Sequence, residues 1–241
     1  MVKKRIDNLL VEKGLAESRA KAQAMIMAGD VLADGKIVLK SGTLVNQDAE
    51  VSVAKPPPFV SRGGMKLDYA LDQFGFSVTG TIVADIGAST GGFTDCLLKR
   101  GANRVYAVDV GYGQLDYRLR QDERVVVMDR VNARNTPDIQ EKLDLIVIDV
   151  SFISIQKIIP AVAGLLKDKG TIIVLVKPQF EAKRDEVGKG GIIKQPEIHA
   201  RVLGRFIKWI TENGYRLRGL VTSPIEGASG NREFLVWIKL T

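Results

Sequence analysis

The pattern of apolar positions predicts a small module of helices and strands at the start of the chain. Helices are expected over residues 3–13 and 18–29, because apolar side chains recur on one face of each and a glycine ends each. The side chains on these two faces are Ile6, Leu9, Leu10, Ala22, Met25 and Ile26. Short β-like segments follow between Asp-Gly and Ser-Gly turns, at 31–32, 36–38 and 50–53. Together these elements describe a compact α+β module.

Three consecutive prolines, 56–58, mark the end of this module, because they fix an extended spacer that neither a helix nor a central strand can contain. Downstream, near-continuous apolar runs alternate with helical patterns, as strands buried on both faces of a parallel sheet do. These runs are TIVADIG, RVYAVDV, RVVVMD, LDLIVIDV and GTIIVLVK. Two last strands, 215–222 and 233–240, alternate like a hairpin. The expected architecture is α/β, with a seven-stranded, mostly parallel sheet in residues 60–241 after a small domain and linker in residues 1–59.

The composition narrows the compartment and the partner. The chain has 35 Lys+Arg against 28 Asp+Glu, a formal charge of +7 and a pI near 9.4. This balance favours a polyanionic partner, although many basic proteins bind no nucleic acid. The single cysteine, Cys96, excludes an internal disulfide and a Cys-rich zinc site and is typical of a reducing compartment. Because there is also no signal-peptide pattern and no apolar stretch of about 18 residues, we expect a cytoplasmic protein with no membrane span and no metal.

A glycine-rich turn between the first apolar run and the next helix is the candidate cofactor site. It lies at the edge of the expected parallel sheet where ligands bind. Its residues are Gly87, Ala88, Ser89, Thr90, Gly91, Gly92 and Phe93. Asp109 ends the next strand about 20 positions later, where a carboxylate accepts hydrogen bonds from ribose hydroxyls. The sequence therefore predicts a cofactor that carries a nucleoside.

Two side chains favour S-adenosyl-L-methionine over NAD as this cofactor. Ser89 replaces the glycine that a pyrophosphate requires, and the charge of Asp85 repels phosphate but suits a ligand with ammonium and sulfonium groups. A turn that binds no ligand is the remaining alternative. Asp129, Arg130 and Asn132 follow the third strand and either reach an adenine edge or cap a helix in solvent, and their position does not decide between the two.

Asp149 and Lys177 are the candidate reaction residues. They end the fourth and fifth strands, which are neighbours in the usual order, so a strand spacing of about 4.8 Å puts them within reach of each other. Burying a charge without a partner is costly, which favours a functional pair over a structural one. Cys96 lies on the first helix, away from the place of a pyrimidine C5 nucleophile, and DVSF replaces the Asn/Asp-Pro-Pro-aromatic run of amino-directed enzymes. A hydroxyl acceptor fits better, because a lysine amine accepts or orients a hydroxyl proton.

Eight motifs occur along the chain in a fixed order. They are RIDNLLVEKGLAESRAKAQAMIMAGDV, FVSRGGMKLDYAL, DIGASTGGFTDCLL, VDVGYGQLDYRLR, DRVNAR, DLIVIDVSFIS, LVKPQFE and GNREFLVW. In this order the chain resembles the TlyA family, in which an S4 RNA-binding domain precedes an FtsJ-like ribose 2′-O-methyltransferase domain. The resemblance covers essentially the whole chain. It implies a Rossmann-like class I methyltransferase fold, S-adenosyl-L-methionine as cofactor, and ribosomal RNA or ribosomal subunits as the partner.

The resemblance also implies a catalytic tetrad of Lys66, Asp149, Lys177 and Glu233, and the chain matches it at all four positions. By analogy Lys177 is the base or aligns the ribose hydroxyl, Asp149 holds Lys177, and the other two residues complete the polar network. Methyl transfer would be an in-line displacement in which alignment supplies much of the rate gain. On the sequence alone, Lys66 is more simply interpreted as a solvated lysine on a helix.

Basic residues of the S4-like part are the candidate RNA contacts, because two short helices can present a basic face to a phosphate backbone. They are Lys3, Lys4, Arg5, Arg19 and Lys21, with Arg62 extending the track beyond the prolines. Residues 1–55 hold nine Lys/Arg against seven Asp/Glu, so affinity must come from their arrangement, and a solvated face is the alternative. His199, the single histidine, is interpreted as structural.

Other functions remain as alternatives. A small-molecule O-methyltransferase would not need an S4-like module, although a fold alone does not decide the substrate. A haemolysin, as some members of the family are labelled, would need exported or membrane-inserting segments, and none is visible. A non-catalytic RNA binder has little reason to retain the tetrad and the cofactor turn. The sequence predicts neither the methylated nucleotide nor the oligomeric state.

Overall fold

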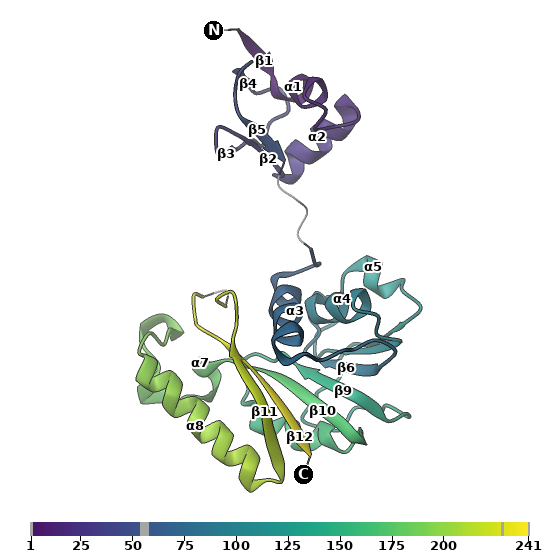
Figure 1. Cartoon of the computed structure of the whole chain (residues 1–241), viewed down its shortest axis with the longest axis vertical. Helices are drawn as coiled ribbons and strands as arrows, with labels where there is room; N and C mark the ends of the chain where they lie inside the picture. Colours follow the sequence, from purple (N-terminus) through teal and green to yellow (C-terminus); the bar gives the residue numbers. More distant parts are fainter. Residues whose placement is uncertain (1, 54–57, 228, 241) are drawn as a thin grey trace. The chain divides into compact units, whose positions relative to one another are not determined.

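The computed structural model describes residues 2–53, 58–227 and 229–240 (Figure 1). The chain divides into two compact units, Met1–Pro57 and Pro58–Thr241. The predicted proline spacer lies, apart from Pro58, outside the described residues. Within the described part of the chain, no helix combines the length and the apolar character that a membrane span requires.

The N-terminal unit contains two helices and two small antiparallel sheets. Its elements are β1 (Lys3–Arg5), α1 (Ile6–Glu12), α2 (Arg19–Ala28), β2 (Val31–Ala33), β3 (Lys36–Ile37), β4 (Leu44–Asn46) and β5 (Val51–Val53). Strand β1 pairs with β4, while β2 lies between β3 and β5. The prediction of a helix from residue 3 is wrong at its start, because residues 3–5 hydrogen-bond as a strand to β4, which the sequence pattern missed. Apolar side chains of both helices meet in a core around Ile6, Leu10 and Ile26.

The second unit is built on a seven-stranded sheet in the order β11-β12-β10-β9-β6-β7-β8. Its strands are β6 (Ile82–Ile86), β7 (Arg104–Val108), β8 (Val125–Met128), β9 (Leu143–Ile148), β10 (Leu166–Val176), β11 (Tyr215–Thr222) and β12 (Phe234–Leu240). Strands β6 to β10 run parallel, and β12 pairs antiparallel with both β10 and β11. The predicted sheet of seven strands with an antiparallel end is therefore confirmed.

Helices cover both faces of this sheet (Figure 1). They are α3 (Arg62–Phe74), α4 (Gly92–Lys99), α5 (Tyr117–Arg120), α6 (Ile159–Ala163), α7 (Pro178–Glu181) and α8 (Pro196–Glu212), with short 3-10 turns η1 (Ile155–Lys157), η2 (Arg184–Glu186) and η3 (Lys189–Gly191). Apolar side chains of α3 and α4 pack on one face, and those of α6 and α8 pack on the other. Because both faces are covered, polar groups gather at the carboxyl ends of the parallel strands.

Candidate functional site

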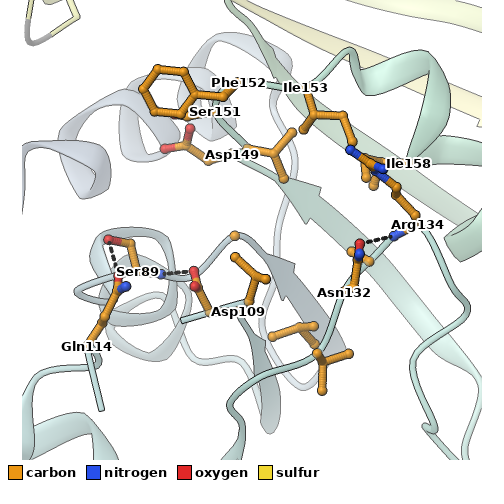
Figure 2. Close-up of a pocket in the computed structure, with 16 residues that line it drawn as sticks. Ser89, Asp109, Gln114, Asn132, Arg134, Asp149, Ser151, Phe152, Ile153 and Ile158 are labelled. Carbon is orange, nitrogen blue, oxygen red and sulfur yellow. Dashed lines mark hydrogen bonds between the residues drawn. The ribbon is translucent and has the colours of Figure 1, made fainter. Parts of the chain in front are cut away.

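Two adjoining hollows lie at the carboxyl ends of β6, β7, β9 and β10. The larger has a volume of about 520 Å³ and is lined by segments that follow β6, β7, β8 and β9 (Figure 2). The smaller, of about 200 Å³, contains Lys66, Asp85 and Lys177 in its wall. Both hollows share Gly87, Ser89, Asp149 and Ser151 in their lining, so they form one continuous candidate site.

The glycine-rich turn connects β6 to α4 and forms the floor between the two hollows. Gly87 has φ +87°, and a Cβ there would overlap the carbonyl oxygen of Asp149. Only glycine fits such a conformation and such a close contact. Gly91 and Gly92 also pack closely against the protein, since their Cβ atoms would overlap Leu119 and the Ser61 hydroxyl. At all three positions a Cβ would meet the protein itself, so these glycines allow close packing of the turn, and the approach of Gly87 to a ligand stays a prediction.

Asp109 follows β7 directly and lines the larger hollow. Its Oδ2 accepts a hydrogen bond from the Ser89 amide at 2.8 Å (Figure 2). Its Oδ1 accepts one from the Gly111 amide at 2.7 Å. The Ser89 hydroxyl in turn donates to Oε1 of Gln114 at 3.3 Å. The carboxylate is thus fixed at the wall of the hollow, where its remaining lone pairs can accept from a ligand.

The three candidates after β8 have different surroundings. Asn132 lines the larger hollow, and its Oδ1 accepts from the Arg134 amide at 3.1 Å (Figure 2). Asp129 instead forms an ion pair with Arg120 at 3.1 Å. Arg130 lies over the ring of Tyr112, with its guanidinium carbon 4.3 Å from the ring centroid. Of the three, the structure brings only Asn132 into the hollow.

Asp85 is fully buried beneath the turn, at the wall of the smaller hollow. Its Oδ2 accepts a hydrogen bond from the Thr94 hydroxyl at 2.7 Å, and its Oδ1 has no partner among the described residues. Burial raises the pKa of Asp85 to about 7. This unpaired carboxylate oxygen is a buried acceptor without a donor, and its burial is costly until its charge is matched by a cationic group.

Four charged residues form two ion pairs around the smaller hollow. Lys177, after β10, lies 2.6 Å from Oδ1 of Asp149, after β9, and donates to the Ser151 hydroxyl at 2.9 Å. Lys66, on α3, donates to Glu233 at 2.5 Å, and both side chains are almost wholly buried. The interpretation of Lys66 as a solvated lysine is therefore wrong, because Glu233 compensates its charge inside the protein.

The family follows from the sequence of both units. An FtsJ-like methyltransferase family matches residues 59–240, and an S4 domain matches residues 4–51. The chain belongs to the FtsJ-like methyltransferase family. With the S4 domain in front, this methyltransferase has the domain order of the TlyA family, and that resemblance is confirmed.

Relatives of this methyltransferase match it over nearly its whole length. YqxC of Bacillus subtilis (strain 168) is 51% identical over 238 residues, which cover 97% of this chain and 85% of YqxC. TlyA of Mycobacterium tuberculosis (strain ATCC 25618 / H37Rv), named as a 16S/23S rRNA (cytidine-2′-O)-methyltransferase, is 44% identical over 239 residues, 98% of this chain and 89% of TlyA. A solved structure from Streptococcus thermophilus, described as a candidate hemolysin, is 43% identical, covers 100% of this chain and 90% of its own, and has a TM-score of 0.76.

Sequence reasoning missed several residues at the mouth of the methyltransferase site. Ser151 contacts Lys177, and the neighbouring Phe152 is 90% exposed at φ +62°, an unusual conformation for a bulky side chain. Glu181 accepts from the Ser154 hydroxyl at 2.7 Å and from the Ile155 amide at 2.8 Å, which ties the segment after β10 to the segment after β9. The motifs DVSFIS and KPQFE contain these residues except Ile155, but the contacts between the two segments have no signal in the local pattern.

The candidate RNA-binding residues of the methyltransferase differ in exposure and in their side-chain partners. Lys3 and Lys21 are exposed, and Lys4 pairs with Glu12 at 2.6 Å. Arg62 is exposed and donates to the backbone oxygen of residue 226. Arg5 and Arg19 both contact the buried carboxylate of Asp7, which has no signal in the local sequence pattern.

The structural interpretation of His199 is confirmed. The side chain is buried, its Nε2 lies 3.1 Å from the backbone oxygen of Ile193, and its ring meets that of Phe234 edge to face. Within the described residues, no three His, Cys, Asp or Glu side chains are grouped as ligands for a metal ion.

Proposed function

We propose that this protein transfers a methyl group from S-adenosyl-L-methionine to the ribose 2′-hydroxyl of cytidine in ribosomal RNA. The observation that carries the proposal is the Lys177–Asp149 ion pair of 2.6 Å at the edge of the smaller hollow. A second pair, Lys66–Glu233, stands beside it. Such an amine, held by a carboxylate next to a cofactor turn, is suited to a hydroxyl acceptor.

The residues around the glycine-rich turn fit S-adenosyl-L-methionine. The unpartnered Oδ1 of Asp85 offers a buried acceptor to a cationic group, and Asp109 offers lone pairs to ribose hydroxyls. Gly87 lines both hollows and lets the turn pass close to the backbone of Asp149, where a Cβ would collide. Asn132 would contact the far end of the ligand from the wall of the larger hollow. When bound, this cofactor supplies an electrophilic methyl group on a sulfonium.

The tetrad has a division of labour in this proposal. Lys177 orients the 2′-hydroxyl and, after its ammonium has released a proton to solvent, accepts the hydroxyl proton as a neutral amine, while Asp149 holds the Lys177 nitrogen in place. Lys66 and Glu233 compensate each other inside the protein and keep the neighbouring wall polar. Because alignment of the reacting groups supplies a large part of such a rate gain, fixed ion pairs are a suitable frame for it.

The second part of the proposal is the substrate. An RNA substrate is supported by the S4 domain and by the formal charge of +7. The fold and the domain order, both as in the TlyA family, support it as well. The M. tuberculosis relative is named for cytidine 2′-O-methylation of 16S and 23S rRNA, and we extend this substrate class to the present chain. We assign RNA binding to residues 1–59 and methyl transfer to residues 60–241. No observation here favours a haemolysin or a small-molecule enzyme.

The test is transfer of a tritiated methyl group from S-adenosyl-L-methionine to purified ribosomal subunits from cells that lack this protein. We expect label in the RNA, and after digestion to nucleosides it should appear as 2′-O-methylcytidine. Subunits from cells that contain the protein should accept little label, because their sites are already methylated. Label on a base, or no label in either subunit, would contradict the proposal.

A further inference from the structure

A single buried carboxylate contacts two arginines of the N-terminal unit. Asp7, in the first turn of α1, is fully buried. Its two oxygens accept hydrogen bonds from Arg5, through Nε at 3.0 Å and Nη2 at 2.8 Å, and from Nε of Arg19 at 3.0 Å. Gln23 and the amide of Asn8 donate to the same group, each at 3.0 Å. Asp7 therefore joins β1, α1 and α2 at one point.

The two arginines reach this point from different elements and still face solvent. Arg5 ends β1 and Arg19 begins α2, and their side chains are 41% and 55% exposed. Arg19 donates to Asp7 through Nε alone. Its two terminal nitrogens have no acceptor among the described residues. Nη1 of Arg5 likewise has no acceptor among these residues. Each guanidinium thus has donors left in a fixed direction, which is what bidentate recognition of phosphate requires.

Electrostatics explains why the carboxylate is needed. Two guanidinium groups that converge on one point repel each other. A buried carboxylate without partners is also unfavourable, because its charge is desolvated. Together the groups compensate, and the Arg5 guanidinium holds the pKa of Asp7 well below its usual range. The acid stays ionised at any physiological pH, and the cluster of three keeps one net positive charge at its outer side.

We propose that Asp7 is a positioning residue for RNA: it holds the guanidinium groups of Arg5 and Arg19 so that their free N–H groups meet phosphates of the RNA backbone. This inference rests on the proposed function, in which the N-terminal unit binds ribosomal RNA. It makes an acidic residue favourable for binding a polyanion. Net charge alone predicts the opposite effect on RNA affinity, because removal of an acid makes the protein more positive and should strengthen binding.

The experiment measures binding of the full-length protein to radiolabelled ribosomal subunits at several salt concentrations. Asp7→Asn should weaken binding by about tenfold and reduce the slope of log affinity against log salt by about one to two, as the loss of one or two phosphate contacts does. In methyl transfer it should raise KM for the subunit and leave kcat unchanged. Glu17→Gln is the matched control: it removes the same charge from an exposed position of the same unit and should bind at least as tightly as wild type.

Two more variants separate positioning from a role in folding. Arg19→Lys keeps the charge of a half-exposed side chain, but its single ammonium nitrogen cannot contact Asp7 and also present the planar pair of terminal nitrogens that binds a phosphate in a bidentate way. It should therefore weaken binding as Asp7→Asn does. In a chain that carries Arg5→Gln and Arg19→Gln, adding Asp7→Asn should cause no further loss of affinity. A further loss in that background would overturn the inference, because Asp7 would then act through the fold.

The remaining outcomes separate this inference from the proposed function. If Asp7→Asn or Arg19→Lys binds as tightly as wild type while the double arginine variant binds weakly, the positioning role is wrong and RNA binding by the N-terminal unit stands. If the double arginine variant also binds as wild type, RNA binding through these arginines is wrong, and the inference fails with it.

Discussion

Replacement of Lys177 by alanine should separate chemistry from folding in this methyltransferase. The amine lies 2.6 Å from Asp149 and 2.9 Å from the Ser151 hydroxyl, and Lys177→Ala removes both contacts. The side chains of the ion pair are only 12% and 21% exposed, so the remaining carboxylate is partly solvated. Loss of its partner should therefore lower the free energy of unfolding by about 1–3 kcal/mol. Breaking a fully buried pair lowers it by more, about 3–5 kcal/mol.

The two effects of this variant differ enough in size to be measured apart. For a domain of this length, a loss of about 1–3 kcal/mol lowers Tm by roughly 3–10 °C, so the variant should remain folded at assay temperature. Methyl transfer should fall by at least about 100-fold, the size typical of a removed acid–base group. Calorimetry should show cofactor binding close to that of wild type, and filter binding should show unchanged affinity for ribosomal subunits.

Controls decide what the lost activity means. Lys177→Arg keeps the charge but should not restore methyl transfer, because arginine does not give up its proton and its planar fork does not fit the place of an ammonium. Lys208→Ala removes a lysine that is 74% exposed at the end of α8 and should leave turnover unchanged. Near wild-type turnover in Lys177→Ala would refute the mechanism, and Asp149 or a group of the substrate would have to accept the proton.

Three further predictions concern the cofactor turn and the mouth of the site. Asp109→Ala should weaken S-adenosyl-L-methionine binding by about tenfold or more in calorimetry, because a ribose acceptor and the anchor of the Ser89 amide are both lost; unchanged affinity would remove this carboxylate from the site. Burial raises the pKa of Asp85 to about 7, so its charge destabilises the fold as pH rises toward 7, whereas a bound cation favours that charge. Cofactor affinity should therefore rise between pH 6 and pH 8 in the wild type and not in Asp85→Asn, and equal profiles would speak against the contact. Glu181→Ala should lower methyl transfer by about tenfold while Glu181→Gln, which can still accept from the Ile155 amide, retains most of it; equal activity of the two would show that this tie does not position the mouth.

The sheet was predictable because strands buried on both faces are continuous apolar runs. Each of the five parallel strands overlaps a predicted run, although β10 begins four residues before its run. The two last strands pair antiparallel as predicted, but β12 is buried along most of its length and does not alternate, because it lies between β10 and β11. The small strands of the N-terminal unit behave differently. Strand β1 (Lys3–Arg5) consists of three basic residues, and its partner β4 lies about forty positions away along the chain. Pairing at that distance leaves no local pattern, so the sequence predicts a helix from residue 3 although the helix begins at Ile6.

The two halves of the tetrad differ in the same way. Asp149 and Lys177 are charged residues at the ends of apolar strands, and a parallel sheet necessarily places such ends side by side. Lys66 lies on an amphipathic helix, where a lysine is usually solvated, and Glu233 precedes the last strand in a polar segment. Nothing near either residue predicts the other. Their burial follows from the packing of α3 against the antiparallel end of the sheet, and only the family resemblance indicated the pair in advance.

The charge of the N-terminal unit shows why counting residues underestimates a binding surface. Nine basic against seven acidic residues leave a small excess, which by itself predicts weak attraction to RNA. Such a count assumes that every acidic residue weakens the attraction to RNA. Asp7 is buried, however, and contributes by fixing two guanidinium groups whose outer donors stay exposed. Since a flexible arginine must lose side-chain freedom when it binds, an arginine already held in place loses less on contact with a phosphate. A modest net charge is therefore compatible with tight binding, provided that acids such as Asp7 lie behind the basic face and not on it.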